Sequence, residues 1–107
     1  MTAEKAVLGS MLQENYLIQE TILQPEHFES NVHKSLFSHI KKIHNDGKPV
    51  DLITLATLSN IESFGGISYI NELLTYANAE KFNDYESLVL ENWKSREKRN
   101  ILKIANT

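Results

Sequence analysis

The placement of the helix-breaking residues is what most limits the folds open to this chain. Its 107 residues include only two prolines and four glycines, which leave long uninterrupted segments between them. Those segments carry apolar residues at the 3.6-residue period of an α-helix, and none shows the alternation of a half-buried strand. A chain of this length has room for one hydrophobic core without cross-links, and it contains no cysteine. The sequence therefore predicts an all-α fold, a small orthogonal bundle of about six helices.

Local signals place the ends of these helices. Asp51 is a good N-cap residue, as is Ser30 or its neighbour Asn31, and Gly47 suits the left-handed position that follows a helix. Thr2 and Asn15 are the corresponding caps of the first two helices. The expected helices span 3–13, 16–23, the stretch from Ser30 or Asn31 to Asp46, 52–60, 67–77 and 84–105.

Three residues in the first part of the chain have a predicted packing role. Gly9 lies inside the first helix, where glycine is unfavourable, so we expect it to allow close approach of another helix. Ile22 belongs to the apolar set of the second helix. Pro25 ends that helix and begins a single turn that carries Phe28 into the core.

The last expected helix divides into two parts. Its first part has a core-facing stripe of four large side chains: Tyr85, Leu88, Val89 and Trp93. Leu90 falls off this stripe. From 94 to 100 no residue is apolar, and a helix that is polar around its whole circumference is leaving its own domain. We therefore expect a helical bundle over 1–93 and, over 94–107, the start of a helical hairpin that continues in a longer protein.

Charge is distributed unevenly along the chain. Residues 1–93 hold six lysines and no arginine against thirteen acidic residues, a net charge of −7, whereas 94–107 carry +4. An acidic surface repels a polyanion, so we expect no direct DNA binding by 1–93. Helices 52–60 and 67–77 have the proportions of a helix-turn-helix, but the second contains one glutamate and no basic residue to contact phosphate. The basic end is either a solvated helix face or a nucleic-acid contact, and the uneven charge also suits docking on another protein.

No group of residues forms a recognisable catalytic or metal-binding motif. Three histidines share the third expected helix: His33, His39 and His44. Their spacings of six and five residues do not match the i, i+4 pair of a helical metal site. We interpret them as partly exposed, with His33 paired to Glu29. Gly47-Lys48 lacks the rest of a phosphate-binding loop, because position 42 is lysine and position 49 is proline. The sequence predicts a chain that is not an enzyme and has no catalytic, cofactor-binding or metal-binding residue.

The sequence also contains no membrane or secretion signal. Its longest apolar runs are far shorter than the roughly 20 residues of a membrane-spanning helix. The first residues lack the basic stretch and apolar run of a signal peptide. We expect a cytoplasmic protein that does not contact a membrane.

Several short motifs occur in an order that matches a known family. They read Glu4-Lys5-Ala6-Val7-Leu8-Gly9-Ser10-Met11-Leu12, Phe28, His33-x-x-Leu36-Phe37-x-x-Ile40, Gly47-x-Pro49-Val50-Asp51-Leu52-Ile53-Thr54-Leu55 and Gly65-Gly66-Ile67-Ser68-Tyr69-Ile70-x-x-Leu73. Each motif is weak alone, but the series resembles the N-terminal domain of the DnaB family of bacterial replicative DNA helicases. The similarity runs from Glu4 to Asn106. Two features depart from the family pattern: a shorter stretch between Leu58 and Gly65, and a start close to the first helix.

The resemblance implies a fold and a function. The family domain is a non-catalytic helical bundle followed by a helical hairpin, and ATP hydrolysis belongs to a RecA-like C-terminal domain that this chain lacks. ATP and Mg²⁺ are therefore expected only there. The N-terminal domains associate as dimers within a hexamer, forming a collar that docks primase and, in some systems, the helicase loader. The alternative is a free-standing helical adaptor domain in replication or regulation, without helicase activity. The resemblance fits a bacterial or a phage-encoded helicase.

The resemblance also assigns roles to single residues. Six positions match the family core: Leu8, Gly9, Phe28, Phe37, Leu55 and Leu73. Four residues are candidates for partner contact: Tyr69, Leu90, Trp93 and Arg96. Tyr69 fits equally well as a core tyrosine with its hydroxyl at the surface. Trp93 and Leu90 either complete the core or form part of a subunit contact, since tryptophan and tyrosine favour interface centres.

Overall fold

Helices account for all the regular structure of residues 2–105. The computed structural model describes the backbone of residues 2–105 and the side chains of residues 2–99, and no strand occurs within this part. The elements, in chain order, are α1 (Thr2–Gln13), α2 (Tyr16–Glu20), the 3₁₀ helix η1 (Pro25–His27), α3 (Asn31–Asn45), α4 (Leu52–Ala56), η2 (Ile61–Phe64), α5 (Gly66–Thr75), η3 (Ala79–Lys81) and α6 (Phe82–Ala105). The predicted all-α fold is confirmed.

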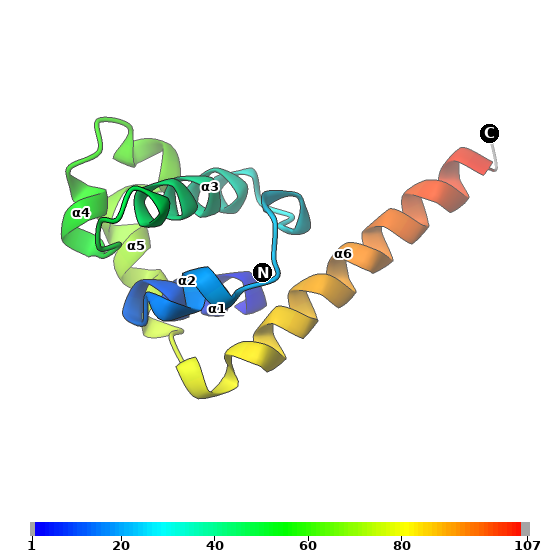
Figure 1. Cartoon of the computed structure of the whole chain (residues 1–107). Helices are drawn as coiled ribbons and strands as arrows, with labels where there is room; N and C mark the ends of the chain where they lie inside the picture. Colours follow the sequence, from blue (N-terminus) through cyan, green and yellow to red (C-terminus); the bar gives the residue numbers. More distant parts are fainter. Residues whose placement is uncertain (1, 106–107) are drawn as a thin grey trace.

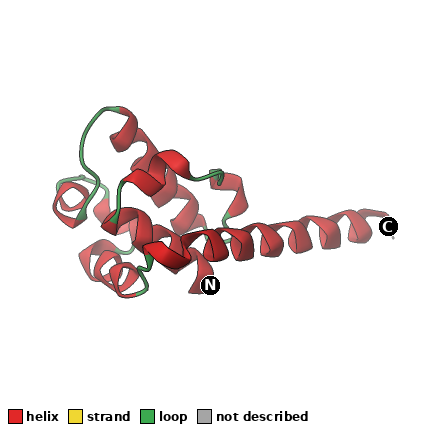
Figure 2. Ribbon diagram, turned by 60° about the horizontal axis from the view of Figure 1, so that its bottom comes forward, coloured by secondary structure: helices red, strands yellow, loops and turns green. Residues whose placement is uncertain are grey.

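Helix α1 is the centre of the arrangement. It lies between α5 and α6 and contacts both, while α3 contacts α1, α2, η1 and η2 (Figure 1). The first half of α6 lies against the bundle, and its second half extends well beyond it (Figures 1 and 2). None of the described helices combines the length and apolar composition needed to cross a bilayer.

A single hydrophobic core draws on nearly every element. Its fully buried large side chains include Leu8 and Met11 of α1, Phe37 of α3 and Leu73 of α5. The five apolar residues assigned to the core by the resemblance are each at most 1% exposed: Leu8, Phe28, Phe37, Leu55 and Leu73. Phe28 follows the η1 turn as expected, so both the turn and its buried residue are confirmed.

Gly9 permits the close contact between α1 and α5. A Cβ atom built on Gly9 would lie 1.9 Å from the carbonyl oxygen of Leu73 and 2.8 Å from its carbonyl carbon. Backbone atoms cannot move aside as the end of a side chain can, so only glycine fits here. The predicted close approach of a second helix is confirmed, and α5 is that helix.

The caps of α3 and α4 are formed as expected. Ser30 accepts a hydrogen bond from the backbone N–H of His33, and Asp51 accepts one of 2.8 Å from the N–H of Thr54. This contact lowers the pKa of the Asp51 carboxyl. Gly47 follows α3 with a φ of 79°, the left-handed conformation expected of it.

The predicted extent of the second helix was wrong. Helix α2 ends at Glu20, and Ile22 is 64% exposed. The helix stops early because the carboxylate of Glu86 accepts hydrogen bonds from the Thr21 hydroxyl and the Ile22 N–H, which draws the chain toward α6. Asn15 makes no cap bond. Its side chain instead pairs with both backbone groups of Val50, at 2.8 and 2.9 Å.

The single helix expected over 52–60 is also wrong. Helix α4 ends at Ala56, and a separate 3₁₀ turn, η2, carries the buried Phe64. Two glycines with positive φ, 92° at Gly65 and 79° at Gly66, then reverse the chain into α5. The additional turn places Phe64 in the core, where the centroid of its ring lies 4.7 Å from the centroid of the His39 ring.

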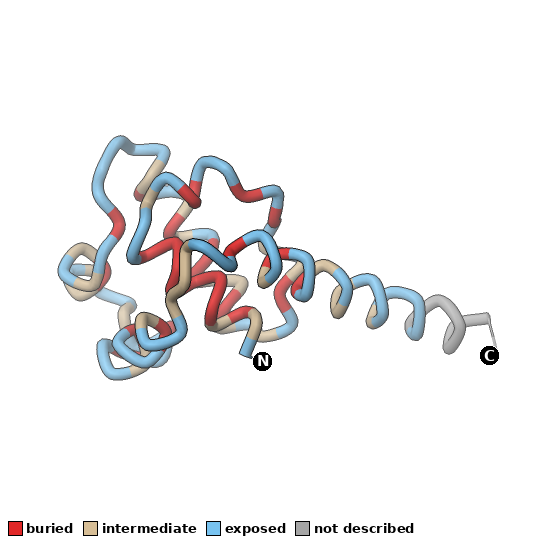
Figure 3. The backbone as a smooth tube through the Cα atoms, turned by 90° about the horizontal axis from the view of Figure 1, so that it is seen from below, coloured by how far each residue is buried: buried red, intermediate tan, exposed pale blue. Residues whose placement is uncertain are grey.

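One member of the predicted core-facing stripe of α6 is wrong: Leu90 takes the place of Leu88. Leu88 is 46% exposed, whereas Leu90 is half-buried and packs on the core. Glu86 explains the difference, because its bonds to the end of α2 turn its own side of the helix inward. Figure 3 shows burial confined to the first part of α6, with exposed residues beyond it.

Candidate functional site

The most distinctive polar site lies where α6 leaves the bundle, beside the η1 turn. Two residues of α6 contact this turn, and both have His27 as a partner. The Trp93 ring meets the His27 ring edge to face, with 4.6 Å between their centroids. Arg96 donates a hydrogen bond of 3.0 Å from Nη2 to the carbonyl oxygen of His27. These contacts fix the direction in which α6 departs.

Arg96 also retains an unused donor. Its Nη1 atom lies 3.4 Å from Oε2 of Glu29, within ion-pair range. That nitrogen is buried and has no hydrogen-bond partner within the described part of the chain. A guanidinium presents five donors and binds carboxylates in a bidentate manner, and the nearest acceptor for this nitrogen is the Glu29 carboxylate.

A hollow adjoins these residues. Its volume is about 400 Å³, and it is lined by Glu26, Phe28, Glu29, Lys34, Trp93, Arg96, Glu97 and Arg99. Aromatic surface and charges of both signs meet in it. Tryptophan and arginine are the residue types that carry most of the binding energy at protein interfaces. The hollow is therefore suited to a protein partner.

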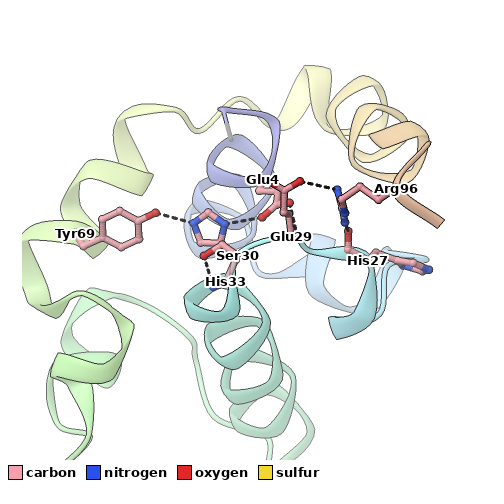
Figure 4. A network of polar contacts seen from close by, with 7 residues as sticks. All are labelled: Glu4, His27, Glu29, Ser30, His33, Tyr69 and Arg96. Atoms are coloured by element: carbon pink, nitrogen blue, oxygen red, sulfur yellow. Dashed lines mark hydrogen bonds and ion pairs between the residues drawn. The ribbon is translucent and has the colours of Figure 1, made fainter. Parts of the chain in front are cut away.

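A buried carboxylate connects this region to α1 and α3. Glu4 is 1% exposed, and its Oε2 accepts the backbone N–H of Glu29 at 2.7 Å. Its other oxygen, Oε1, lies 2.7 Å from Nδ1 of His33, which is 2% exposed (Figure 4). Glu4 therefore joins α1 to the segment before α3 and to the first turn of α3.

Tyr69 of α5 is the far end of the same network. Its hydroxyl lies 2.6 Å from Nε2 of His33 (Figure 4). His33 thus lies between the two groups, with Nδ1 facing Glu4 and Nε2 facing the Tyr69 hydroxyl. The polar contacts then run from Tyr69 through His33 and Glu4 to Glu29, and from Glu29 to Arg96. They connect α5, α3, α1 and α6.

Electrostatics favour a charged Glu4 and a neutral Tyr69. Burial alone raises the pKa of the Glu4 carboxyl, but the hydrogen bonds from His33 and Glu29, with the charge of His33, hold it below its usual range. Burial raises the pKa of Tyr69. The carboxylate, the imidazole and the hydroxyl together tie α1, α3 and α5 to one another.

The interpretation of His33 as a partly exposed partner of Glu29 was wrong. His33 is buried and pairs with Glu4, while the Glu29 side chain is directed to Arg96. The cause is tertiary, because α1 supplies a carboxylate within reach of the first turn of α3. A signal was present in the sequence: Glu4 shares the helical face of Val7, Leu8 and Met11, where a carboxylate needs a buried partner.

The four residues expected to contact a partner do not form one cluster. Trp93 and Arg96 lie together at the hollow, and Tyr69 connects to Arg96 only through the network. Leu90 is half-buried against the core. The residues 2–99 contain no group of three or more histidine and acidic side chains placed to hold a metal ion.

The fold and this site define a class of protein: an all-helical bundle with a long helix leading out of it. The chain belongs to the DnaB-like helicase N-terminal domain family, whose model matches residues 1–91. The replicative DNA helicase DnaB of Geobacillus stearothermophilus is 36% identical over 90 residues, covering 75% of this chain and 20% of that protein. The replicative DNA helicase DnaC of Bacillus subtilis (strain 168) is also 36% identical over 90 residues, with the same coverage. The chain thus spans about a fifth of the length of these relatives.

Solved structures agree with this assignment. The N-terminal domain of the DnaB helicase from Mycobacterium tuberculosis superimposes with a TM-score of 0.85 at 25% identity, covering 99% of this chain and 85% of that one. A DnaB-like replicative helicase, described with its interactions with primase, also gives a TM-score of 0.85, at 31% identity. It covers 98% of this chain and 27% of the helicase chain.

Proposed function

We propose that this chain is the collar domain of a replicative DNA helicase. In this role it holds subunits together in the hexameric ring and docks primase, and it also contacts the helicase loader. The observation that carries the proposal is the family match over residues 1–91, since the relatives are replicative helicases. A similar solved helicase is described with its interactions with primase, which supports that partner.

The chemistry of the domain supports a non-catalytic role in this proposal. The buried carboxylate of Glu4 is held by two donors, and Tyr69 retains its proton. In this proposal the two groups serve to hold α1, α3 and α5 together through His33. ATP hydrolysis then belongs to another domain of the parent protein, which unwinds DNA at the replication fork. A protein with this task works in the cytoplasm.

The four candidate residues take distinct parts in the proposed docking. Trp93 and Arg96 make direct contact, because both border the hollow. Tyr69 and Leu90 position them. Tyr69 does so through the network to Glu29, and Leu90 does so by packing the first half of α6 on the core.

Substitution of Trp93 and Arg96 tests this assignment. In the full-length helicase carrying this domain, Trp93→Ala and Arg96→Ala are each expected to weaken primase binding at least about tenfold, the loss typical of an interface anchor. The measurement is isothermal titration calorimetry with purified primase. Tyr16→Ala is the matched control, because Tyr16 is a 54% exposed aromatic residue on α2. If all three variants bound primase as the wild type does, docking at this hollow would be excluded.

A further inference from the structure

The lysines of the acidic bundle are concentrated in one place. Of the six lysines in residues 1–93, four lie in the short stretch 34–48, where Asp46 is the only acidic residue. That stretch has a net charge of +3, and the rest of 1–93 has a net charge of −10. Helix α3 and the loop after it therefore form a basic patch on an acidic body. We call it the α3 patch: Lys34, Lys41, Lys42 and Lys48.

The patch follows the outer face of α3. Lys34 and Lys41 are seven residues apart, so they project from the same side of the helix, and Lys42 lies beside them. Lys42 and Lys48 are exposed and Lys34 is half-buried. Lys41 is partly committed, since its Nζ donates to the carbonyl oxygen of Ile18 at 3.0 Å and lies 5.9 Å from the centre of the Phe37 ring.

Grooves border α3 on both sides of Lys42. One has a volume of about 490 Å³ and is bordered by Pro25, Ser38, Lys41, Lys42 and Asn45, among others. A second, of about 240 Å³, is lined in part by Lys42, Lys48 and Leu58. The patch therefore offers shaped surface beside its charges, which a flat cluster of lysines would not.

We propose that the α3 patch binds an acidic segment of a partner protein, lying extended along α3. Lys34 and Lys42 are separated by about 12 Å along the helix axis, which about four residues of extended chain span. Carboxylates on one side of such a segment reach Lys34, Lys41 and Lys42 in turn. The patch adjoins the hollow proposed for primase, because Lys34 lines that hollow, so the test below uses lysines away from it.

The surrounding charge selects a short acidic peptide over nucleic acid. Away from Lys34, a long polyanion would extend onto the acidic remainder of the bundle, where its phosphates meet like charge within a Debye length of about 10 Å. At the Lys34 end it would meet three glutamates beside Arg96 and Arg99. A segment of a few residues contacts only the lysines. Charge complementarity therefore favours a peptide of limited length.

Binding of a defined probe tests the proposal. The probe is a fluorescein-labelled peptide of about twelve residues with alternating glutamate and serine, which places its carboxylates on one side of an extended chain. Its comparison peptide carries glutamine in place of glutamate, and a labelled oligothymidylate of equal charge represents nucleic acid. The measurements, at low salt, are fluorescence anisotropy and amide chemical shifts of the 107-residue chain.

Two double variants of equal net charge give the decisive comparison. Lys42→Gln/Lys48→Gln is expected to weaken binding of the acidic peptide about fivefold to tenfold, as for two exposed ion pairs. Lys81→Gln/Lys94→Gln, at two exposed lysines outside the patch, leaves it unchanged. The shifted amides are expected along α3, and the glutamine peptide does not bind. Equal weakening by both double variants, shifts located elsewhere, or tighter binding of the oligothymidylate at α3 would each overturn the proposal.

Discussion

Replacing Gly9 by alanine is expected to lower the free energy of unfolding by about 3 kcal/mol or more, which is severe for a domain of this size. The new methyl group would lie 1.9 Å from the carbonyl oxygen of Leu73. Helices α1 and α5 would have to separate, and their separation would open the core around Leu8 and Leu73. The measurement is urea denaturation followed by the helical circular dichroism signal.

Gly47 provides the control for this substitution. Its Cβ position has no atom within 4 Å, but its φ of 79° disfavours other residues. Gly47→Ala is therefore expected to cost only about 1 kcal/mol, from backbone strain alone. A Gly9→Ala protein as stable as the Gly47→Ala protein would show that α1 and α5 are not in the close contact described.

Replacing Glu4 by glutamine is expected to cost about 2–3 kcal/mol of stability at neutral pH. The two carboxylate oxygens accept from the N–H of Glu29, in a half-buried bond, and from Nδ1 of His33, in a buried one. A glutamine has one carbonyl oxygen, so its NH₂ group faces either the Glu29 N–H, which then loses its acceptor, or Nδ1 of His33, which must then give up its proton to accept. In both arrangements the bonds to a charged carboxylate are replaced by weaker neutral contacts.

The loss caused by Glu4→Gln should also depend on pH. The pKa of Glu4 is lower in the folded chain than the 4.5 of an unperturbed glutamate. Its stabilising contribution is therefore complete above that value and disappears as the pH falls through the folded pKa. The stability gap between wild type and variant should stay constant from pH 7 down to about 4.5 and shrink below that pH toward pH 3.

Urea denaturation at several pH values measures this gap. Glu91→Gln, at an exposed position on α6, is the control and should change stability by less than about 0.5 kcal/mol at every pH. A gap for Glu4→Gln that stayed constant between pH 7 and pH 3 would contradict a charged, hydrogen-bonded Glu4 in the folded chain.

Elements with local signals were predictable from the sequence. The N-cap of Asp51 and the left-handed Gly47 depend on neighbours within four residues, so sequence spacing is sufficient to locate them. The packing role of Gly9 could be predicted because glycine destabilises a helix interior and is expected there only where another segment comes close. The sequence could not show that this segment is α5. The missing apolar face beyond Trp93 predicts where α6 leaves the bundle, but Arg96 still bonds to His27, so a boundary at residue 94 stays a prediction.

What sequence reasoning missed depends on contacts between distant segments. His33 is buried because Glu4, 29 residues away, meets its ring. Leu88 and Leu90 exchange roles because Glu86 binds the end of α2, 65 residues from Thr21. Hydrophobic periodicity assigns charged residues to the surface, so it cannot find a carboxylate that is buried with a partner. At the candidate site, Trp93 and Arg96 were identified by residue type, whereas the hollow beside η1 required the fold.

The most direct test of the proposed function is a titration of this chain with the helicase-binding region of primase. Trp93 is the only tryptophan of the chain, so its fluorescence reports on the hollow without labelling. The docking role predicts a saturable change in its emission, together with amide chemical-shift changes at Glu29, Trp93 and Arg96. No saturable change in either signal up to about 1 mM primase region, the weakest affinity of functional interest, would contradict it.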